Sequence, residues 1–186
     1  MSRVSRVFMG MIMALTLAAC ATQGPGEPPK PQRVSLTTLP AGASAAAQQG
    51  ENALTRAILD AVNAWRGEKG ISPLSPDPTL QRAAAIHSAD MSLRNFVGSF
   101  NPDGQGTRER VLAVDPNFKG DVFETIDVLQ DAAGQPAEAV ASEVVKSWTT
   151  DPTRRKVLRD ATLTRSGVGV TTKGSDLYVT EVFATE

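Results

Sequence analysis

The sequence predicts an α+β fold in which helices come first and the strands of a small antiparallel sheet gather late in the chain. Apolar residues with helical spacing dominate the first part of residues 51–186, whereas β-branched and aromatic residues concentrate in 121–129 and again after 166. The glycine-containing turn Lys173-Gly174-Ser175-Asp176 separates the last two apolar segments, which favours a β-hairpin. Helices followed by strands are typical of α+β folds, since α/β folds alternate the two kinds of element.

The first two helices are predicted over about 52–68 and about 78–95. Gly70 lies just past the end of the first, and Asp77-Pro78 supplies an N-cap and a first helical residue for the second. The apolar stripe of the first helix consists of Leu54, Ala57, Ile58, Ala61, Val62 and Trp65. The second helix places Leu80, Ala84, His87 and Met91 on one face.

The middle of the chain is predicted to contain a loop, a short helix and a strand. Residues 101–106, NPDGQG, are rich in turn formers, and Thr107 is expected to cap a short helix that ends at Leu112. Residues 121–129, DVFETIDVL, have the composition of a strand.

The last part of the chain is predicted to contain two helices and the hairpin. Pro136 starts the third long helix, and Asp151-Pro152 starts a short one that reaches about Arg159. Residues 167–172 and 177–184 form the two strands of the hairpin. The stripe of the long helix is Val140 or Ala141, Val144, Val145 and Trp148.

Composition excludes several classes of function. The chain has 186 residues, with 19 Lys and Arg against 20 Asp and Glu, and residues 51–186 alone carry a net charge of −4, which argues against nucleic acid as a partner. It has one Cys and one His, so an internal disulfide is excluded and a Cys/His zinc knuckle is not expected. No cofactor is predicted.

Residues 1–19 are predicted to be a lipoprotein signal peptide. Arg3 and Arg6 precede an apolar run over 7–17, which is too short to span a bilayer, and Leu17-Ala18-Ala19-Cys20 resembles a bacterial lipobox. In such sequences the Cys thiol takes a diacylglycerol and the peptide is cut before it, so acyl chains on Cys20 would anchor the protein in a membrane. A plain secretory signal with a chance Cys is the alternative interpretation.

The expected location is the cell envelope, with the domain lipid-anchored. Ala21 and Thr22 follow the Cys where an Asp would resemble an inner-membrane retention signal, which favours the outer membrane, facing the periplasm, in a host with two membranes. Residues 20–50 hold five of the twelve prolines and few large apolar side chains, so they are expected to be a disordered tether for a domain over 51–186.

Several strings in the domain resemble bacterial members of the CAP superfamily, which covers cysteine-rich secretory proteins, antigen 5 allergens and pathogenesis-related proteins. The resemblance covers about 53–184 and implies a three-layer α-β-α sandwich with a small antiparallel sheet. The matching strings, in chain order, are Asn63-Ala64-Trp65-Arg66, Gly70-Ile71-Ser72-Pro73-Leu74, Ala85 to Met91, Asn101-Pro102-Asp103-Gly104, Trp148, Asp151-Pro152, Arg155 and Gly167-Val168-Gly169-Val170.

The resemblance also implies that a metal site has been lost. Many relatives line a cleft with two His and one or two Glu that can bind a divalent metal. Ser99 and Arg154 stand at the two His places, and Glu124 alone remains of the acidic residues. Zinc needs three or four such ligands, so no metal is predicted to bind.

The candidate cleft residues are Glu124, Arg154, Ser99 and His87. Glu124 and Arg154 are predicted to lie on opposite walls of the cleft and to pair, with an exposed basic face as the alternative role of Arg154. His87, on an apolar stripe, is either a hydrogen-bonded structural residue or a cleft base or ligand. Glu124 is either a structural ion pair or a ligand contact, and Arg66 is expected to be structural.

The predicted function is binding or scaffolding of a lipid, a peptidoglycan fragment or an envelope protein. The alternative is an envelope hydrolase or peptidase that uses the cleft. No catalytic residue is assigned, because the only Cys is expected to be lipidated and Ser88, next to His87 on a helix, faces another direction.

Overall fold

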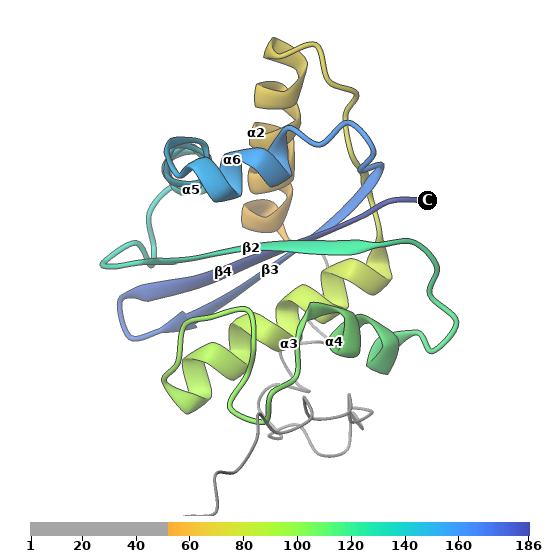
Figure 1. Ribbon diagram of the computed structural model, residues 1–186. Coiled ribbons are helices and arrows are strands. Elements are labelled where there is room, and N and C mark those ends of the chain that lie inside the picture. The colour runs from red at the N-terminus through yellow and green to blue at the C-terminus, as the bar shows by residue number, and fades with distance from the viewer. Residues whose placement is uncertain (1–51) are drawn as a thin grey trace, which may run out of the picture. The chain divides into compact units, whose positions relative to one another are not determined.

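The computed structural model describes residues 52–186, which form three layers (Figure 1). A sheet lies between a layer of α2, α5 and α6 and a layer of α3 and α4, as predicted for an α-β-α sandwich. The helices are α2 (Ala53–Glu68), α3 (Pro78–Arg94), α4 (Thr107–Val114), α5 (Ala137–Thr150) and α6 (Pro152–Leu158). The strands are β1 (Ser75–Pro76), β2 (Val122–Leu129), β3 (Arg165–Lys173) and β4 (Asp176–Ala184).

The sheet has the strand order β1-β3-β4-β2. The predicted strands β2, β3 and β4 pair in antiparallel fashion along their whole length, with Glu124 opposite Val182 and Thr125 opposite Glu181. The two-residue strand β1, which the sequence analysis did not predict, adds a short parallel edge beside β3. Two residues are too few to show an alternating pattern, so β1 has no signal in the sequence.

The helix starts follow the predicted caps in two of three cases. The side chains of Asp77 and Asp151 accept hydrogen bonds from the backbone N–H groups at the starts of α3 and α6. The expected cap at Thr107 is wrong. Gly106 is the N-cap of α4, and its N–H donates to Glu109 Oε2 at 2.9 Å, which leaves the Thr107 hydroxyl free to accept from Arg110.

Helix α3 packs directly against β3 because two strand residues have no side chain. A Cβ on Gly167 would lie 2.0 Å from the backbone nitrogen of Gln81, and one on Gly169 would lie 2.2 Å from that of Ala85. Ser88 crosses the same contact, since its hydroxyl donates to the Gly169 carbonyl at 2.9 Å. The close approach holds His87, one residue earlier on α3, fully buried above the sheet.

Each face of the sheet has its own hydrophobic core. The core under α3 and α4 includes Leu80, Val111 and Val182, and the larger core under α2, α5 and α6 includes Trp148 and Phe183. Successive strand side chains point to opposite faces, so Val122 and Glu124 of β2 lie on the α4 side, whereas Thr125, Asp127 and Leu129 lie on the α5 and α6 side.

Arg66 is structural, as expected. Its guanidinium is fully buried at the end of α2 and donates to the backbone carbonyls of Ser72, Leu158, Asp160 and Leu163 at 2.9–3.2 Å. The side chain thereby joins α2 to the loop after α6.

Among residues 52–186, no helix is long and apolar enough to cross a membrane. The predicted signal peptide over 1–19, the lipidation of Cys20 and the tether over 20–50 lie outside the described residues.

Candidate functional site

The single imidazole, His87, is locked in one protonation state. Its Nε2 lies 2.9 Å from the Gly98 carbonyl oxygen, and because that oxygen can only accept, Nε2 carries the proton. Nδ1 is buried without a partner. Burial, reinforced by the positive charge of Arg110, lowers the pKa of His87 to about 3, so the ring is neutral at ordinary pH.

Next to His87, Arg110 of α4 and Glu124 of β2 form a buried ion pair. One guanidinium nitrogen, Nη2, donates to Glu124 Oε2, and both side chains are only 2% exposed. The other carboxylate oxygen, Oε1, lies 3.8 Å from His87 Nε2. Because His87 is neutral, this second contact is not an ion pair. Of the two readings of Glu124, the geometry favours the structural one.

The charge of Glu124 depends on its partners. Burial raises the pKa of its carboxyl group, and Arg110 is the main opposing influence. The side chains of Ser99 and Thr107 also act to lower the same pKa. The predicted cleft residues His87, Ser99 and Glu124 therefore do meet around Arg110, with the side chains of His87, Glu124 and Arg110 buried and Ser99 exposed at the edge.

The same cluster fixes the loop between α3 and α4. His87 donates to the carbonyl of Gly98, and Arg110 Nη1 donates to those of Ser99 and Gln105 at 3.0 and 3.1 Å. Inside the loop, the Asn101 side chain accepts from the backbone N–H groups of Asp103 and Gln105. The loop over 95–106 is thus held by side chains at its base and by its own hydrogen bonds.

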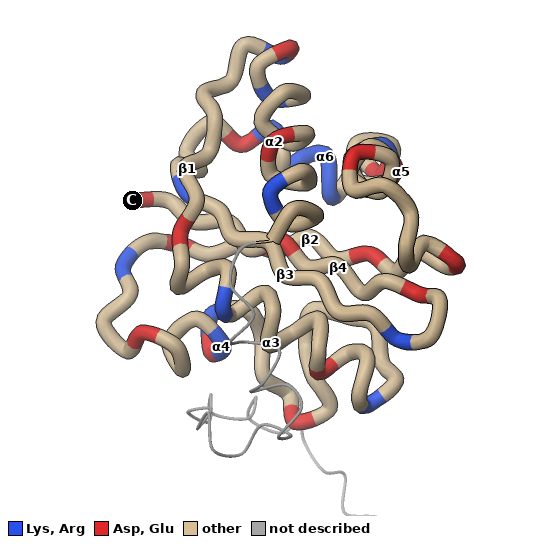
Figure 2. The backbone as a smooth tube through the Cα atoms, turned by 180° about the vertical axis from the view of Figure 1, so that it is seen from behind, with Lys and Arg blue, Asp and Glu red and all other residues tan. Residues whose placement is uncertain are grey.

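Arg154 does not take part in this cluster, and its predicted pairing with Glu124 is wrong. It extends from α6 on the other side of the sheet, where its Nη1 lies 3.5 Å from Asp127 Oδ2 and 3.3 Å from Ser147 Oγ. Glu124 and Asp127 are three residues apart on a strand, so they point to opposite faces. Arg154 instead begins the basic stretch of α6, which continues with Arg155 and Lys156 (Figure 2).

The cluster does not fit the divalent metal of the resemblance. A cation at this place would need the Nε2 lone pair of His87, which is protonated and bonded to Gly98, and it would be repelled by the guanidinium of Arg110. Over residues 52–186 no three His, Cys, Asp or Glu side chains come together as a ligand set. The cation that the buried Glu124 carboxylate faces here is the guanidinium of Arg110.

Sequence reasoning missed Arg110. The string Thr107-Arg108-Glu109-Arg110 reads as a charged, solvated helix start. The available signal was its position: Arg110 lies three residues after Thr107 and directly before the buried Val111, at the edge of the face that α4 turns to the sheet.

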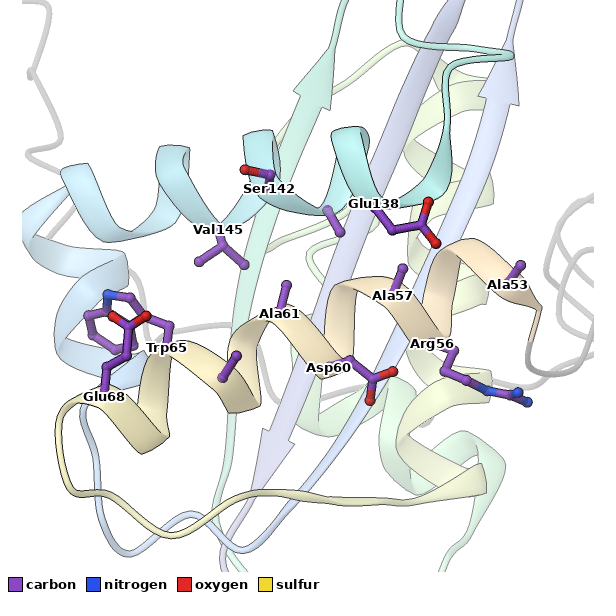
Figure 3. Close-up of a pocket in the computed structure, with 12 residues that line it drawn as sticks. Ala53, Arg56, Ala57, Asp60, Ala61, Trp65, Glu68, Glu138, Ser142 and Val145 are labelled. Atoms are coloured by element: carbon purple, nitrogen blue, oxygen red, sulfur yellow. The ribbon is translucent and has the colours of Figure 1, made fainter.

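A separate hollow lies between α2 and α5 on the opposite side of the sheet (Figure 3). We call it the α2–α5 groove. It has a volume of about 670 Å³, and its floor consists of small or apolar side chains: Ala53, Ala57, Ala61, Ala64, Ala141, Val145 and Trp65. Asp60, Glu68 and Glu138 add negative charge, and Arg56 and Ser142 complete the lining.

Comparisons with known proteins agree with the layered fold. YkwD of Bacillus subtilis (strain 168), described as uncharacterized, is 25% identical over 127 residues, which are 67% of this chain and 45% of YkwD. The crystal structure of an extracellular protein containing a SCP domain from Bacillus anthracis has a TM-score of 0.61 at 25% identity, covering 73% of this chain and 41% of that one. An outer surface protein of Borrelia burgdorferi has a TM-score of 0.62 at 15% identity, covering 74% of this chain and 99% of that one.

The chain thus spans less than half the length of the two Bacillus relatives. The cysteine-rich secretory protein family, CAP, matches residues 59–185, which run from within α2 to just past the end of β4. Since this range contains every strand and all helices of the described part except the start of α2, the chain belongs to the cysteine-rich secretory protein (CAP) family.

Proposed function

We propose that this protein is a cell-envelope lipoprotein whose CAP domain binds a ligand without transforming it. The burial of the His87, Arg110 and Glu124 side chains carries this proposal. An enzyme needs an activated nucleophile or water beside a base that can take a proton. The nitrogen of His87 that could accept a proton, Nδ1, is fully buried, and Glu124 is occupied by Arg110, so neither group can reach a substrate as a base.

The α2–α5 groove offers a better place for a ligand. Its floor of alanines, with Val145 and Trp65, suits an acyl chain, because methyl groups and an indole ring gain from excluding water. The rim carries more negative than positive charge, which disfavours anionic cell-wall polymers and phosphate headgroups. Among the three ligand classes expected from the sequence, this chemistry favours a lipid with a neutral or cationic headgroup.

The proposed location is the surface of an envelope membrane, through acyl chains on Cys20. The lipobox-like string before Cys20 supports it, and two structural neighbours are described as extracellular and as an outer surface protein. In a host with two membranes, the absence of Asp after the Cys favours the outer membrane, with the domain in the periplasm.

Ligand binding can be tested by filling the groove. Ala57→Trp places a large ring on its floor, whereas Ala139→Trp places the same ring on an exposed position of α5 outside the groove. Titration with a fluorescent monoacylglycerol should show at least about tenfold weaker binding for Ala57→Trp and unchanged binding for Ala139→Trp. If both variants bound with the same affinity as the unmodified chain, the ligand would not bind in the groove.

Anchoring is tested independently of the ligand. Cells that express the full chain should yield a protein that is cut before Cys20 and carries the mass of diacylglycerol and an N-acyl group. Cys20→Ser should leave an uncut precursor without lipid. Cleavage of that variant after Ala19 would identify a plain secretory signal instead.

A further inference from the structure

We infer that the end of α3 and the loop after it form a surface that rests on a lipid bilayer. Leu93, Val97 and Phe100 are 50%, 62% and 69% exposed. Among the described residues, three of the four large apolar side chains that are highly exposed fall within these eight positions, and the fourth is Phe123 on β2. We call the three residues the 93–100 patch.

The backbone keeps the three residues close together. Helix α3 ends at Arg94, Asn95 takes the left-handed conformation with φ of 56°, and the N–H of Phe96 bonds back to the carbonyl of Met91. The chain from Leu93 to Val97 reaches at most about 14 Å and that from Val97 to Phe100 at most about 10 Å. A patch of this size is large enough to enter the boundary between headgroups and acyl chains.

The patch does not collapse onto the protein because the buried cluster holds its backbone. His87 binds the carbonyl of Gly98 and Arg110 binds that of Ser99, so two successive residues between Val97 and Phe100 are fixed. A loop that is fixed in place while it exposes a Val and a Phe marks an interaction surface. His87 and Arg110 therefore acquire a role: they position this loop.

The charges around the patch fit a neutral, zwitterionic lipid surface. Arg94 is paired with Asp90 at 2.5 Å and with Asp103 at 2.6 Å, and Lys173 donates to the Ser92 carbonyl at 2.9 Å. Two cations thus face two carboxylates, which leaves no net charge to attract anionic headgroups. Contact with the bilayer should consequently be insensitive to salt.

The proposed lipid anchor on Cys20 would keep the domain close to a bilayer. The inference rests on the proposed lipid attachment at Cys20. This residue lies 32 residues before Asn52, and an extended chain of that length reaches at most about 110 Å. The α3 and α4 side can therefore reach the membrane in which Cys20 is held. Helices α2 and α5 lie across the sheet from α3 (Figure 1), so the groove that they line stays accessible when the patch contacts the bilayer.

The test attaches the chain chemically, so that its outcome does not depend on acylation in the cell. Residues 20–186, which include every described residue, are coupled through the only thiol, Cys20, to a maleimide lipid in phosphatidylcholine vesicles. Phe100→Trp reports on the patch. Phe123→Trp is the matched control, because Phe123 lies on the α5 and α6 side of the sheet, opposite to Glu124 and α3. Dibrominated phosphatidylcholine should reduce the added emission of Phe100→Trp about twofold or more and leave that of Phe123→Trp nearly unchanged.

Val97→Trp is a second reporter at an exposed position, and it should be quenched like Phe100→Trp. The quenching should be the same in 50 mM and 500 mM salt, because a patch without net charge does not respond when the screening length falls from about 14 Å to about 4 Å. Equal quenching of the patch reporters and of Phe123→Trp would overturn the inference. Loss of the difference at high salt would do so as well, because it would indicate attraction by charge.

Discussion

Two buried glutamates on opposite faces of the same sheet have different partners. Glu124 on β2 points to the α4 side and pairs with Arg110, whereas Glu181 on β4 lies in the face under α2 and hydrogen-bonds only the hydroxyl of Ser166. Burial raises the pKa of both carboxyl groups. For Glu181 it raises the pKa to about 8, since a hydroxyl and the more distant Arg66 do not offset complete burial.

The comparison shows that the charge state of a buried carboxyl group depends on the hydrogen-bond donors and cations around it. The charge of Arg66 acts to lower the pKa of Glu181, but its guanidinium is committed to four backbone carbonyls. Glu181 Oε2 has no hydrogen-bond partner, which is consistent with a protonated group. We therefore regard Glu124 as an ionised clamp and Glu181 as a neutral residue near pH 7.

The largest expected effect is loss of the clamp in Arg110→Ala. The variant leaves the Glu124 carboxylate buried without its cation, and we expect the free energy of unfolding to fall by about 3–5 kcal/mol in urea denaturation. In a Glu124→Gln background the same change should be clearly smaller, which a double-mutant cycle measures.

Arg154→Ala is the control for that experiment. Its ion pair with Asp127 is longer and one-third exposed on the arginine side, so its loss should change the free energy of unfolding by less than about 1 kcal/mol. An effect of Arg154→Ala as large as that of Arg110→Ala would reverse the assignment of the two arginines.

The next effect is a fall of stability with rising pH that Glu181 causes. Because its folded pKa of about 8 exceeds the unfolded value of 4.5, the unfolded chain releases this proton first, and stability is lost as pH rises from 4.5 to 8. From pH 6.5 to 8 the loss should total about 2 kcal/mol, with a slope near 1.4 kcal/mol per pH unit at the lower end that falls to about half at the folded pKa. Glu181→Gln should remove this slope, and any slope that remains reports on Glu124.

His87 should act in the opposite direction at lower pH. Its folded pKa of about 3 lies below the unfolded 6.5, so the stability that it contributes is present above pH 6.5 and is lost as pH falls. From pH 6.5 to 5 the loss amounts to about 2 kcal/mol. Glu181 masks it in the unmodified chain, so the comparison belongs in the Glu181→Gln background, where His87→Gln should flatten the curve.

The smallest expected effect is that of zinc. A cation would have to displace Arg110 from Glu124 and the Nε2 proton from Gly98, so addition of zinc to the purified chain should leave its melting temperature unchanged. Arg110→Ala, which removes the competing guanidinium, is the variant to compare. A stabilisation of the unmodified chain that Glu124→Ala abolishes would contradict the reading of the cluster.

Sequence patterns were sufficient to predict the helices and the long strands, but not to predict which side chain pairs with Glu124. Caps such as Asp77-Pro78 and apolar stripes depend on local chemistry, which is why the predicted helices and the three long strands agree with the structure. The cluster was predicted in part, because the resemblance brought His87, Ser99 and Glu124 together. The pairing failed because it ignored strand parity: α6 covers the face of Asp127, and only α4 can reach Glu124. Which helix covers which face is decided by packing over long sequence separations.

The contact of α3 with Gly167 and Gly169 also has a consequence for motion. A helix whose backbone touches the strand backbone has no side-chain layer that can rearrange, so α3, β3 and β4 must open together or not at all. Amide protons of α3, β3 and β4 should exchange with solvent only on global unfolding. Helices α2 and α5 instead pack together through side chains, and a long apolar guest could enter the groove that they line without disturbing the fixed loop on the far side.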